Sequence, residues 1–342
     1  MYGLKKWLAS RMIAKSRKQP ALPIETLETK QQNPDLEHFN DSSYFFGRHE
    51  DGSFMVVRQS FRTGKPTEHW LNIRIPGKGT FILYESPGPE GEGFQQGSLT
   101  FTCVEINKKW HLAYEGHMTD EAGKNRQIKI DLNFEALHPM VDFSRISSPE
   151  TTGALIAKEK WSKEFFAKVK EIRKQHIEQG GYLTGTITID GEAIQVNWRS
   201  IRDHSFGVRS WAKWGRHMWL GGVLDDGRVF NVSAINYDFL GTLSAGFLTD
   251  KSGGFTPVKV TKTFDDFATD PLIPDQFTFE MTTEDGKQHQ IEVNIPDNFD
   301  FVMDGAYRIF EGAGVYKLDG IAGLGISEFG FNISKYGERN MD

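Results

Sequence analysis

Short apolar segments separated by turn residues are the feature that most limits how this chain can fold. Between residues 38 and 147, segments such as 70–75 and 80–84 are only a few residues long, and proline and glycine follow each of them closely. From Ile128 to Phe134 every second residue is apolar, which is typical of an antiparallel strand with one face toward water. The pattern predicts β-strands joined by tight turns.

The same pattern returns after residue 182. Asp-Gly pairs at 190–191, 226–227 and 319–320 stand between apolar segments, and this dipeptide is favoured in two-residue hairpin turns. Helical segments between successive apolar segments are missing, so the sequence disfavours a parallel α/β fold.

Residues 149–179 differ from both flanking regions. Apolar side chains recur there every three or four residues, lysine and glutamate fill the other positions, and Gly180-Gly181 follows. This spacing predicts one amphipathic helix. The recurring side chains are Trp161, Phe165, Val169, Ile172 and His176.

We therefore predict an all-β chain of two antiparallel β-barrels joined by a linker helix. The length of 342 residues suits two domains. Residues 44–52 and 219–227 both begin with an aromatic residue, contain a glycine and end in acid-Asp-Gly, which fits a duplicated barrel. The predicted divisions are a basic N-terminal segment (1–37), a first β domain (38–148), the linker helix (149–180) and a second β domain (181–342).

Composition excludes several classes of protein. Cys103 is the single cysteine, so the chain has neither a disulfide framework nor a cysteine-based metal site. No apolar run approaches the roughly 18 residues that a transmembrane helix needs. The net charge of −6 disfavours a nucleic-acid partner.

Charge is unevenly distributed, because residues 1–24 carry six cations and no acid, which leaves −12 on the remainder. Three interpretations compete for this segment: a helix lying on anionic lipid, a mitochondrial presequence, and a solvated N-terminal helix or tail. We favour the solvated segment over either of the other two. We expect a cytoplasmic protein whose contact with membranes, where it has any, is peripheral and made through residues 1–24.

The densest group of chemically active residues lies in 198–219. Four of the eight tryptophans, Trp198, Trp211, Trp214 and Trp219, fall within these 22 residues. Between them lie Arg202, Asp203, His204 and Arg209. An acid, a base and a guanidinium among aromatic rings are the groups that a proton-transfer site requires.

A structural interpretation of the same residues has the stronger support from spacing alone. It is a buried Arg–Asp pair beside a histidine that satisfies backbone groups. Adjacent residues of a strand point to opposite faces. Asp203 and His204 can therefore share a site only where the backbone turns, and Gly207 makes a bend nearby feasible.

The segment Arg-Asp-His-Ser-Phe-Gly-Val-Arg-Ser-Trp at 202–211 resembles the Asp-His-x-Trp/Phe-Gly signature of the lipocalin-like family that includes AttH and carotenoid 1,2-hydratase. It is most similar to an uncharacterised branch, which residues 179–182, 307–312 and 325–330 also resemble. The resemblance covers residues 38–335, with its specific motifs in the second half. Phe206 and Ser210 depart from the residues frequent in relatives, and the loss of an acid at position 210 weakens any argument for paired carboxylates.

The resemblance implies two lipocalin-like barrels, an apolar pocket in or between them, and chemistry that needs neither a metal nor an organic cofactor. Asp203 would be the acid that protonates a C=C bond, with His204 positioning it or holding water. Arg202 and Arg209 would orient the acid or neutralise a polar group of the substrate. Candidate pocket walls are Trp198, Trp211, Trp214 and Trp219, and the second-choice acids are Glu311 and Glu328.

Two functions follow as hypotheses. The first is a cofactor-independent hydratase or cyclase, a lyase or isomerase, for a terpenoid or another lipid-like substrate. The second is a non-catalytic carrier of an apolar ligand. An accessory domain that only mediates protein contacts is a weaker third, because fold does not settle function.

Overall fold

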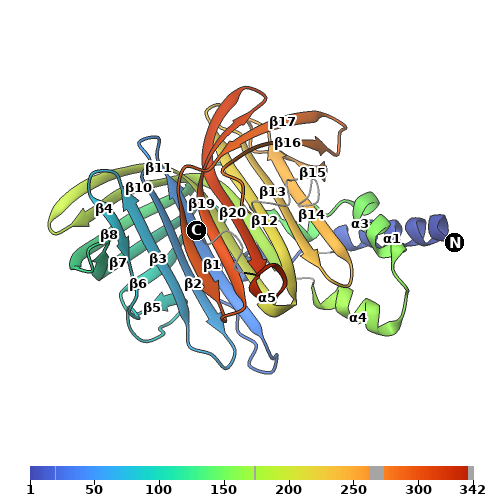
Figure 1. Ribbon diagram of the computed structural model, residues 1–342, viewed down its shortest axis with the longest axis horizontal. Coiled ribbons are helices and arrows are strands. Elements are labelled where there is room, and N and C mark those ends of the chain that lie inside the picture. The colour runs from blue at the N-terminus through green and yellow to red at the C-terminus, as the bar shows by residue number, and fades with distance from the viewer. Residues whose placement is uncertain (20, 173–174, 262–272, 338–342) are drawn as a thin grey trace. The chain divides into compact units, whose positions relative to one another are not determined.

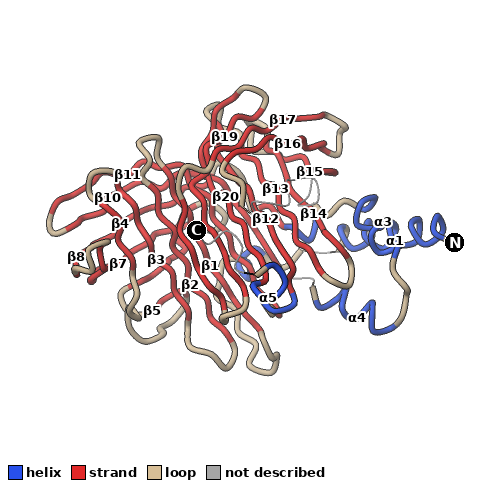
Figure 2. Tube along the Cα trace, in the orientation of Figure 1, coloured by secondary structure: helices blue, strands red, loops and turns tan. Residues whose placement is uncertain are grey.

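The computed structural model describes residues 1–19, 21–172, 175–261 and 273–337. The chain divides into two compact units, each containing one barrel (Figure 1). We call Ala21–Val141 with His176–Val208 the N-barrel unit, and Met1–Pro20, Asp142–Gln175 and Arg209–Asp342 the C-barrel unit. Strands make up most of both units (Figure 2).

The N-barrel is an eight-stranded antiparallel barrel in the order β4-β3-β2-β1-β11-β10-β8-β7, closed by pairing of β4 with β7. Strands β6 and β5 extend the sheet beyond β7, and β9 pairs with β10. The strands are β1 (Phe39–Arg48), β2 (Phe54–Arg62), β3 (Glu68–Ile75), β4 (Gly79–Ile82), β5 (Phe94–Gln96), β6 (Leu99–Glu105), β7 (Lys109–Asp120), β8 (Asn125–Ala136), β9 (Val141–Asp142), β10 (Gln175–Ile189) and β11 (Glu192–Val208).

The C-barrel has the order β17-β16-β15-β14-β13-β12-β20-β19 and is closed by pairing of β17 with β19, while β18 pairs with β19 outside the ring. It too has eight antiparallel strands in the ring. The strands are β12 (Trp214–Leu224), β13 (Val229–Tyr237), β14 (Gly241–Thr249), β15 (Phe255–Thr261), β16 (Gln276–Thr283), β17 (Gln288–Asn294), β18 (Asn298–Met303), β19 (Tyr307–Leu318) and β20 (Ile321–Asn332).

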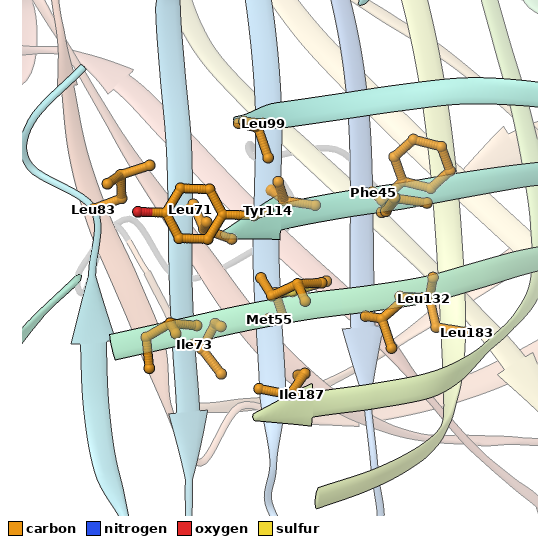
Figure 3. Packing of buried hydrophobic residues seen from close by; sticks show 14 of the residues in the cluster. Phe45, Met55, Leu71, Ile73, Leu83, Leu99, Tyr114, Leu132, Leu183 and Ile187 are labelled. Carbon is orange, nitrogen blue, oxygen red and sulfur yellow. The ribbon is translucent and has the colours of Figure 1, made fainter. Parts of the chain in front are cut away.

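Alternation along the strands fills the interior of each barrel with apolar side chains. In β8 the buried residues are Ile128, Ile130, Leu132 and Phe134, and the residues between them are exposed. Phe45 packs among such side chains from several strands of the N-barrel (Figure 3). The C-barrel has a comparable buried cluster. The predicted all-β fold of two antiparallel barrels is therefore confirmed.

The three predicted Asp-Gly hairpins are also present. Asp190 and Gly191 have φ values of 48° and 87°, and Asp319 and Gly320 have 49° and 86°, the positive values that a type I′ turn requires at both central positions. These turns connect β10 to β11 and β19 to β20, and the third Asp-Gly pair connects β12 to β13. Turn chemistry thus sets the register of the β10–β11 and β19–β20 hairpins.

The single linker helix predicted over 149–179 is wrong. The segment contains α3 (Pro149–Lys158) and α4 (Lys163–Glu171), whereas residues 173–174 lie outside the described part of the chain. Ser162 is the N-cap of α4, because its side chain accepts a hydrogen bond from the backbone N–H of Phe165, and α4 is therefore a separate helix. His176, placed on the helical face by its spacing, lies instead in β10.

The predicted domain boundary at residue 181 is contradicted as well. Strands β10 and β11 complete the N-barrel, since β10 pairs with β8 and β11 pairs with β1. The N-barrel therefore closes only after the chain has passed through α3 and α4 in the other unit. Sequence order does not reveal this interleaving, because the barrel's last hairpin looks the same in either domain.

The predicted N-terminal segment divides between the units. α1 (Tyr2–Arg17) belongs to the C-barrel unit and lies beside α3 (Figure 1), whereas α2 (Ile24–Leu27) belongs to the N-barrel unit. Among the described residues, the remaining short helices are two 3-10 turns, Phe143–Arg145 and Trp211–Lys213, and α5 (Ile333–Tyr336). In the described residues, no helix has both the length and the apolar character needed to span a membrane.

Candidate functional site

Strand β11 divides the signature residues between its two faces. Phe45, a member of the N-barrel core, lies opposite Arg202, and Tyr44 lies opposite Asp203. Because directly opposed residues share a face and successive residues alternate, Arg202 and His204 face the barrel interior and Asp203 faces outward. The bend considered near Gly207 does not bring Asp203 and His204 together, since β11 continues through both.

The interior residues form a buried ionic network. Arg202 donates to Glu28 at 2.8 and 3.3 Å and to the Gln179 side chain at 2.7 Å. The side chains of Arg202 and Glu28 are 1% and 2% exposed. The guanidinium also lies over the Trp110 ring, 4.3 Å from its centroid. These contacts hold the segment that follows α2 against the inside of the barrel.

His204 forms the second pair of this network. One ring nitrogen lies 2.8 Å from Asp41 and the other lies 2.8 Å from the backbone oxygen of Leu27. Burial disfavours the charged imidazole, but the Asp41 carboxylate and the Leu27 carbonyl outweigh it and raise the pKa of His204. Both side chains are fully buried, so the pair suits a structural role better than contact with a substrate.

On the outward face, Asp203 belongs to a cluster that the sequence did not predict. His176 Nε2 lies 2.6 Å from Asp203 Oδ2 and 3.0 Å from Glu178 Oε1. We call these three residues the His176 cluster. The side chains of His176 and Asp203 are 29% and 12% exposed, whereas Glu178 is buried. Some surface of His176 and Asp203 thus reaches solvent, whereas the atoms that face one another, His176 Nε2, Asp203 Oδ2 and Glu178 Oε1, are buried.

The carboxylates hold a proton on His176. Burial alone would lower its pKa, but the charge of Asp203 and hydrogen bonds to Asp203 and Glu178 overcome this and raise the pKa to about 10. His176 and Asp203 thus form an imidazolium–carboxylate pair at neutral pH.

This pair makes stability depend on pH. The folded chain retains a proton on His176 that the unfolded chain releases near pH 6.5, so the stabilisation is complete below about pH 6.5 and disappears as the pH rises through about 10. We expect the free energy of unfolding of His176→Gln to be lower than that of wild type at pH 6.5. This difference between the two proteins should shrink toward pH 10 by at most about 1.4 kcal/mol per pH unit. Urea unfolding of both proteins across this range measures the difference. A difference that stays constant with pH would contradict the raised pKa.

The His176 cluster is also where a metal ion could bind among the described residues. One ligand atom from each of His176, Glu178 and Asp203 lies within 4.8 Å of the others. A cation there would have to displace the proton of His176. The resemblance described above implies chemistry that needs no metal.

The C-barrel unit contains a second histidine cluster, on β12, β19 and β20. His217 Nδ1 lies 2.7 Å from the Tyr307 hydroxyl, and its Nε2 contacts the Glu328 carboxylate. Burial, together with the charge of Glu328, raises the pKa of Tyr307 well above its ordinary value. Tyr307 therefore remains protonated, and the His217 ring lies between its hydroxyl and the Glu328 carboxylate. We call these three residues the His217 cluster.

Most of the predicted aromatic wall adjoins the His217 cluster. The Trp211 and Trp214 rings are 4.9 Å apart, and Tyr307 lies 5.4 and 5.9 Å from them. The Arg209 guanidinium lies 5.1 Å from the Trp211 ring centroid. Trp219 and the fully buried Glu311 both lie opposite Glu328 on neighbouring strands.

Trp198 is not part of this group, because it lies in the core of the N-barrel. The candidate site residues are thus distributed over three places: the N-barrel interior (Trp198, Arg202, His204), its outward face (Asp203), and the C-barrel unit (Arg209, Trp211, Trp214, Trp219, Glu311, Glu328).

Sequence reasoning missed His176, Glu178, His217 and Tyr307. Two signals could have found the first pair. His176 and Glu178 are two residues apart, which is the spacing at which strand residues share a face. The residues from 182 onward already predict a strand, and both residues join that strand if it begins before residue 176. For the second pair the signal is weaker, because His217 and Tyr307 are 90 positions apart.

Comparison with known proteins agrees with this fold. The structure is similar to that of a protein assigned as AttH from Nitrosomonas europaea, with a TM-score of 0.60 and 13% identity over 92% of this chain and 98% of that chain. It is also similar to kievitone hydratase from Nectria haematococca, with a TM-score of 0.51 and 9% identity over 90% of this chain and 94% of that chain. At these identities the likeness shows the fold alone, and it confirms the resemblance to AttH-like proteins at that level.

No curated protein matches the sequence significantly. One family model, described as a domain of unknown function (DUF7064), matches residues 26–333. The match extends from α2 to the start of α5 and includes both barrels and both histidine clusters. The chain therefore belongs to the DUF7064 family.

Proposed function

We propose that this protein is a hydratase or cyclase that protonates a C=C bond of a terpenoid or another lipid-like substrate at the His176 cluster. The observation that carries the proposal is the cluster itself, an imidazolium held by two carboxylates and partly open to solvent. The fold shared with kievitone hydratase supports the same reaction class. The resemblance of residues 202–211 to the signature of the uncharacterised branch supports Asp203 as its centre.

The cluster can supply and recover one proton. Two carboxylates within 4.8 Å of each other share a single imidazolium, so one proton lies within reach of both carboxylates. As the His176 imidazolium passes its proton to Asp203, the Asp203 carboxyl would donate that proton to one alkene carbon, and the positive charge would develop on the other. Water would then add to the cation and return a proton to the carboxylate. In a cyclase, a second alkene of the substrate would close a ring instead, and the ring cation would lose a proton to the carboxylate.

The surroundings of Asp203 fit an apolar substrate. Tyr44 lies directly opposite Asp203 on β1, and Phe46 lies on the same face of that strand. Both side chains are buried. Aromatic faces stabilise a nearby cation, by about 0.5 kcal/mol at exposed sites and by 2 kcal/mol or more where water is excluded.

The carrier hypothesis has less support from the barrels. The N-barrel interior is occupied by large buried side chains such as Phe45, Trp110 and Phe134, and the C-barrel core contains Phe230, Phe279 and Tyr316. A lipocalin-style carrier holds its ligand inside such a barrel. The filled interiors therefore argue against a carrier that holds its ligand inside a barrel.

The test is incubation of a lipid extract of the host with the protein in deuterated water, followed by untargeted mass spectrometry. Asp203→Asn is treated in parallel. We expect a compound that is consumed only by wild type, with a product that gains a carbon-bound deuteron, and in the hydratase case the mass of heavy water. An identical product profile with Asp203→Asn would overturn the role of Asp203. An apolar compound that co-purifies unchanged with both proteins would favour the carrier.

A further inference from the structure

The N-terminal helix α1 has two faces of different character. One face packs on α3, where Ala9 and Ile13 are buried and Ser10 lies so close to Gly153 that a side chain at that glycine would clash. Polar contacts hold the same face. Lys5 donates to the Glu159 carbonyl at 2.9 Å, and Arg17 donates to the Arg145 carbonyl at 2.6 Å and pairs with Glu284. The helix is therefore a docked part of the C-barrel unit.

The other face of α1 exposes large apolar side chains that this packing does not use. Leu4, Trp7, Leu8 and Met12 are 64%, 52%, 38% and 46% exposed. Residues three and four apart lie on one side of a helix, so these four form a continuous strip. Strips of this kind on soluble domains mark surfaces that bind a partner or a membrane.

Cations extend the same strip. Arg11 and Lys15 are exposed and continue the line begun by Trp7, and Lys18 follows at the end of the helix. The Arg11 guanidinium lies 4.8 Å from the Trp7 ring centroid. Residues 1–24 contain no acid. One side of α1 therefore presents apolar groups along its N-terminal half and positive charge along its C-terminal half.

We propose that this face of α1 binds an anionic lipid surface. Such a surface matches both halves of the strip, because acyl chains accept leucine and tryptophan while phosphate headgroups attract lysine and arginine. Tryptophan is also favoured at the boundary between acyl chains and headgroups. The 16-residue helix lies along the membrane and does not cross it. The proposal does not depend on the proposed reaction, although it would bring the protein to the phase where apolar substrates collect.

The test is sedimentation of the full-length protein with vesicles of phosphatidylcholine alone and with vesicles that also contain phosphatidylserine. We expect binding only to the anionic vesicles, and weaker binding as salt is added. Brominated lipids should quench Trp7 on binding. This signal is specific, because six of the other tryptophans are buried and Trp161 is half-buried.

Variants separate the two halves of the strip. Leu4→Glu with Leu8→Glu should lower the partition coefficient at least tenfold by removing apolar contact. Lys15→Glu with Lys18→Glu should lower it at least about 25-fold, at roughly fivefold for each cation. Matched controls are Val302→Glu and Lys251→Glu, which change exposed residues elsewhere in the same unit and should bind like wild type.

Two results would overturn the proposal. One is the absence of phosphatidylserine-dependent binding, or binding that the leucine double variant leaves unchanged while circular dichroism shows a folded protein. The other is a concentration-dependent dimer that the leucine double variant abolishes, which would assign the strip to a second copy of the chain.

Discussion

Replacing Arg202 with methionine is expected to lower the free energy of unfolding by about 3–5 kcal/mol. The guanidinium is buried and donates to Glu28 and Gln179. Its removal would leave the Glu28 carboxylate buried inside the barrel without its counter-charge, and this desolvated charge accounts for most of the cost. Urea unfolding followed by tryptophan fluorescence measures the loss.

A double variant tests the cause. Glu28→Gln combined with Arg202→Met removes both charges, so we expect it to be clearly more stable than Arg202→Met alone. Arg199→Met is the matched control on the same strand. Arg199 is 15% exposed and its partner Glu50 is 75% exposed, so removal of Arg199 leaves no buried charge behind and should cost less than that of Arg202. If the double variant were as unstable as the single one, the loss would come from packing of the long side chain, not from a stranded charge.

The fold could be predicted because its determinants are local. Alternation from Ile128 to Phe134 fixes which side of one strand enters the core, and Asp-Gly pairs fix where hairpins turn. Both signals act over a few residues and depend on side chains adjacent in sequence. The interleaving of the units could not be predicted in this way. It depends on which distant strand accepts the last hairpin of the N-barrel, and neither turn chemistry nor periodicity encodes that choice.

The candidate site was predicted only in part, for a similar reason. The resemblance singled out Asp203 and Glu328, and in the structure each of them contacts a histidine. The partner of Asp203, His176, was assigned to a helix because it continues the spacing of Trp161 to Ile172. Periodicity cannot exclude one further residue at the end of a helix, since boundaries are the least certain part of such predictions. His176 lies in a strand because β10 pairs with β8, and periodicity within one segment does not report a pairing between distant segments.

The adjacent residues Asp203 and His204 should respond in opposite ways to the same substitution. We expect Asp203→Asn to lower turnover of the substrate identified in deuterated water by about 100- to 10,000-fold, the usual contribution of a general acid. Near pH 10, where the ion pair with His176 no longer adds stability, its free energy of unfolding should fall by only about 1–2 kcal/mol, because asparagine still accepts a hydrogen bond from His176. His204→Asn should instead cost about 3–5 kcal/mol, since it leaves the fully buried Asp41 carboxylate without its imidazole. Its folded fraction should retain turnover near the wild-type rate.

The contrast rests on the two faces of β11. Asp203 lies on the outward face with 12% of its side chain exposed, and His204 lies inside the barrel with no exposed surface. A readout independent of turnover accompanies the test. Without the Asp203 charge the pKa of His176 should fall from about 10 toward its ordinary value, which NMR titration of the imidazole would follow. Loss of turnover without that fall would assign Asp203 to catalysis and not to holding the proton of His176. If Asp203→Asn and His204→Asn were both fully folded and lost turnover equally, the two faces of β11 would not divide a catalytic residue from a structural one.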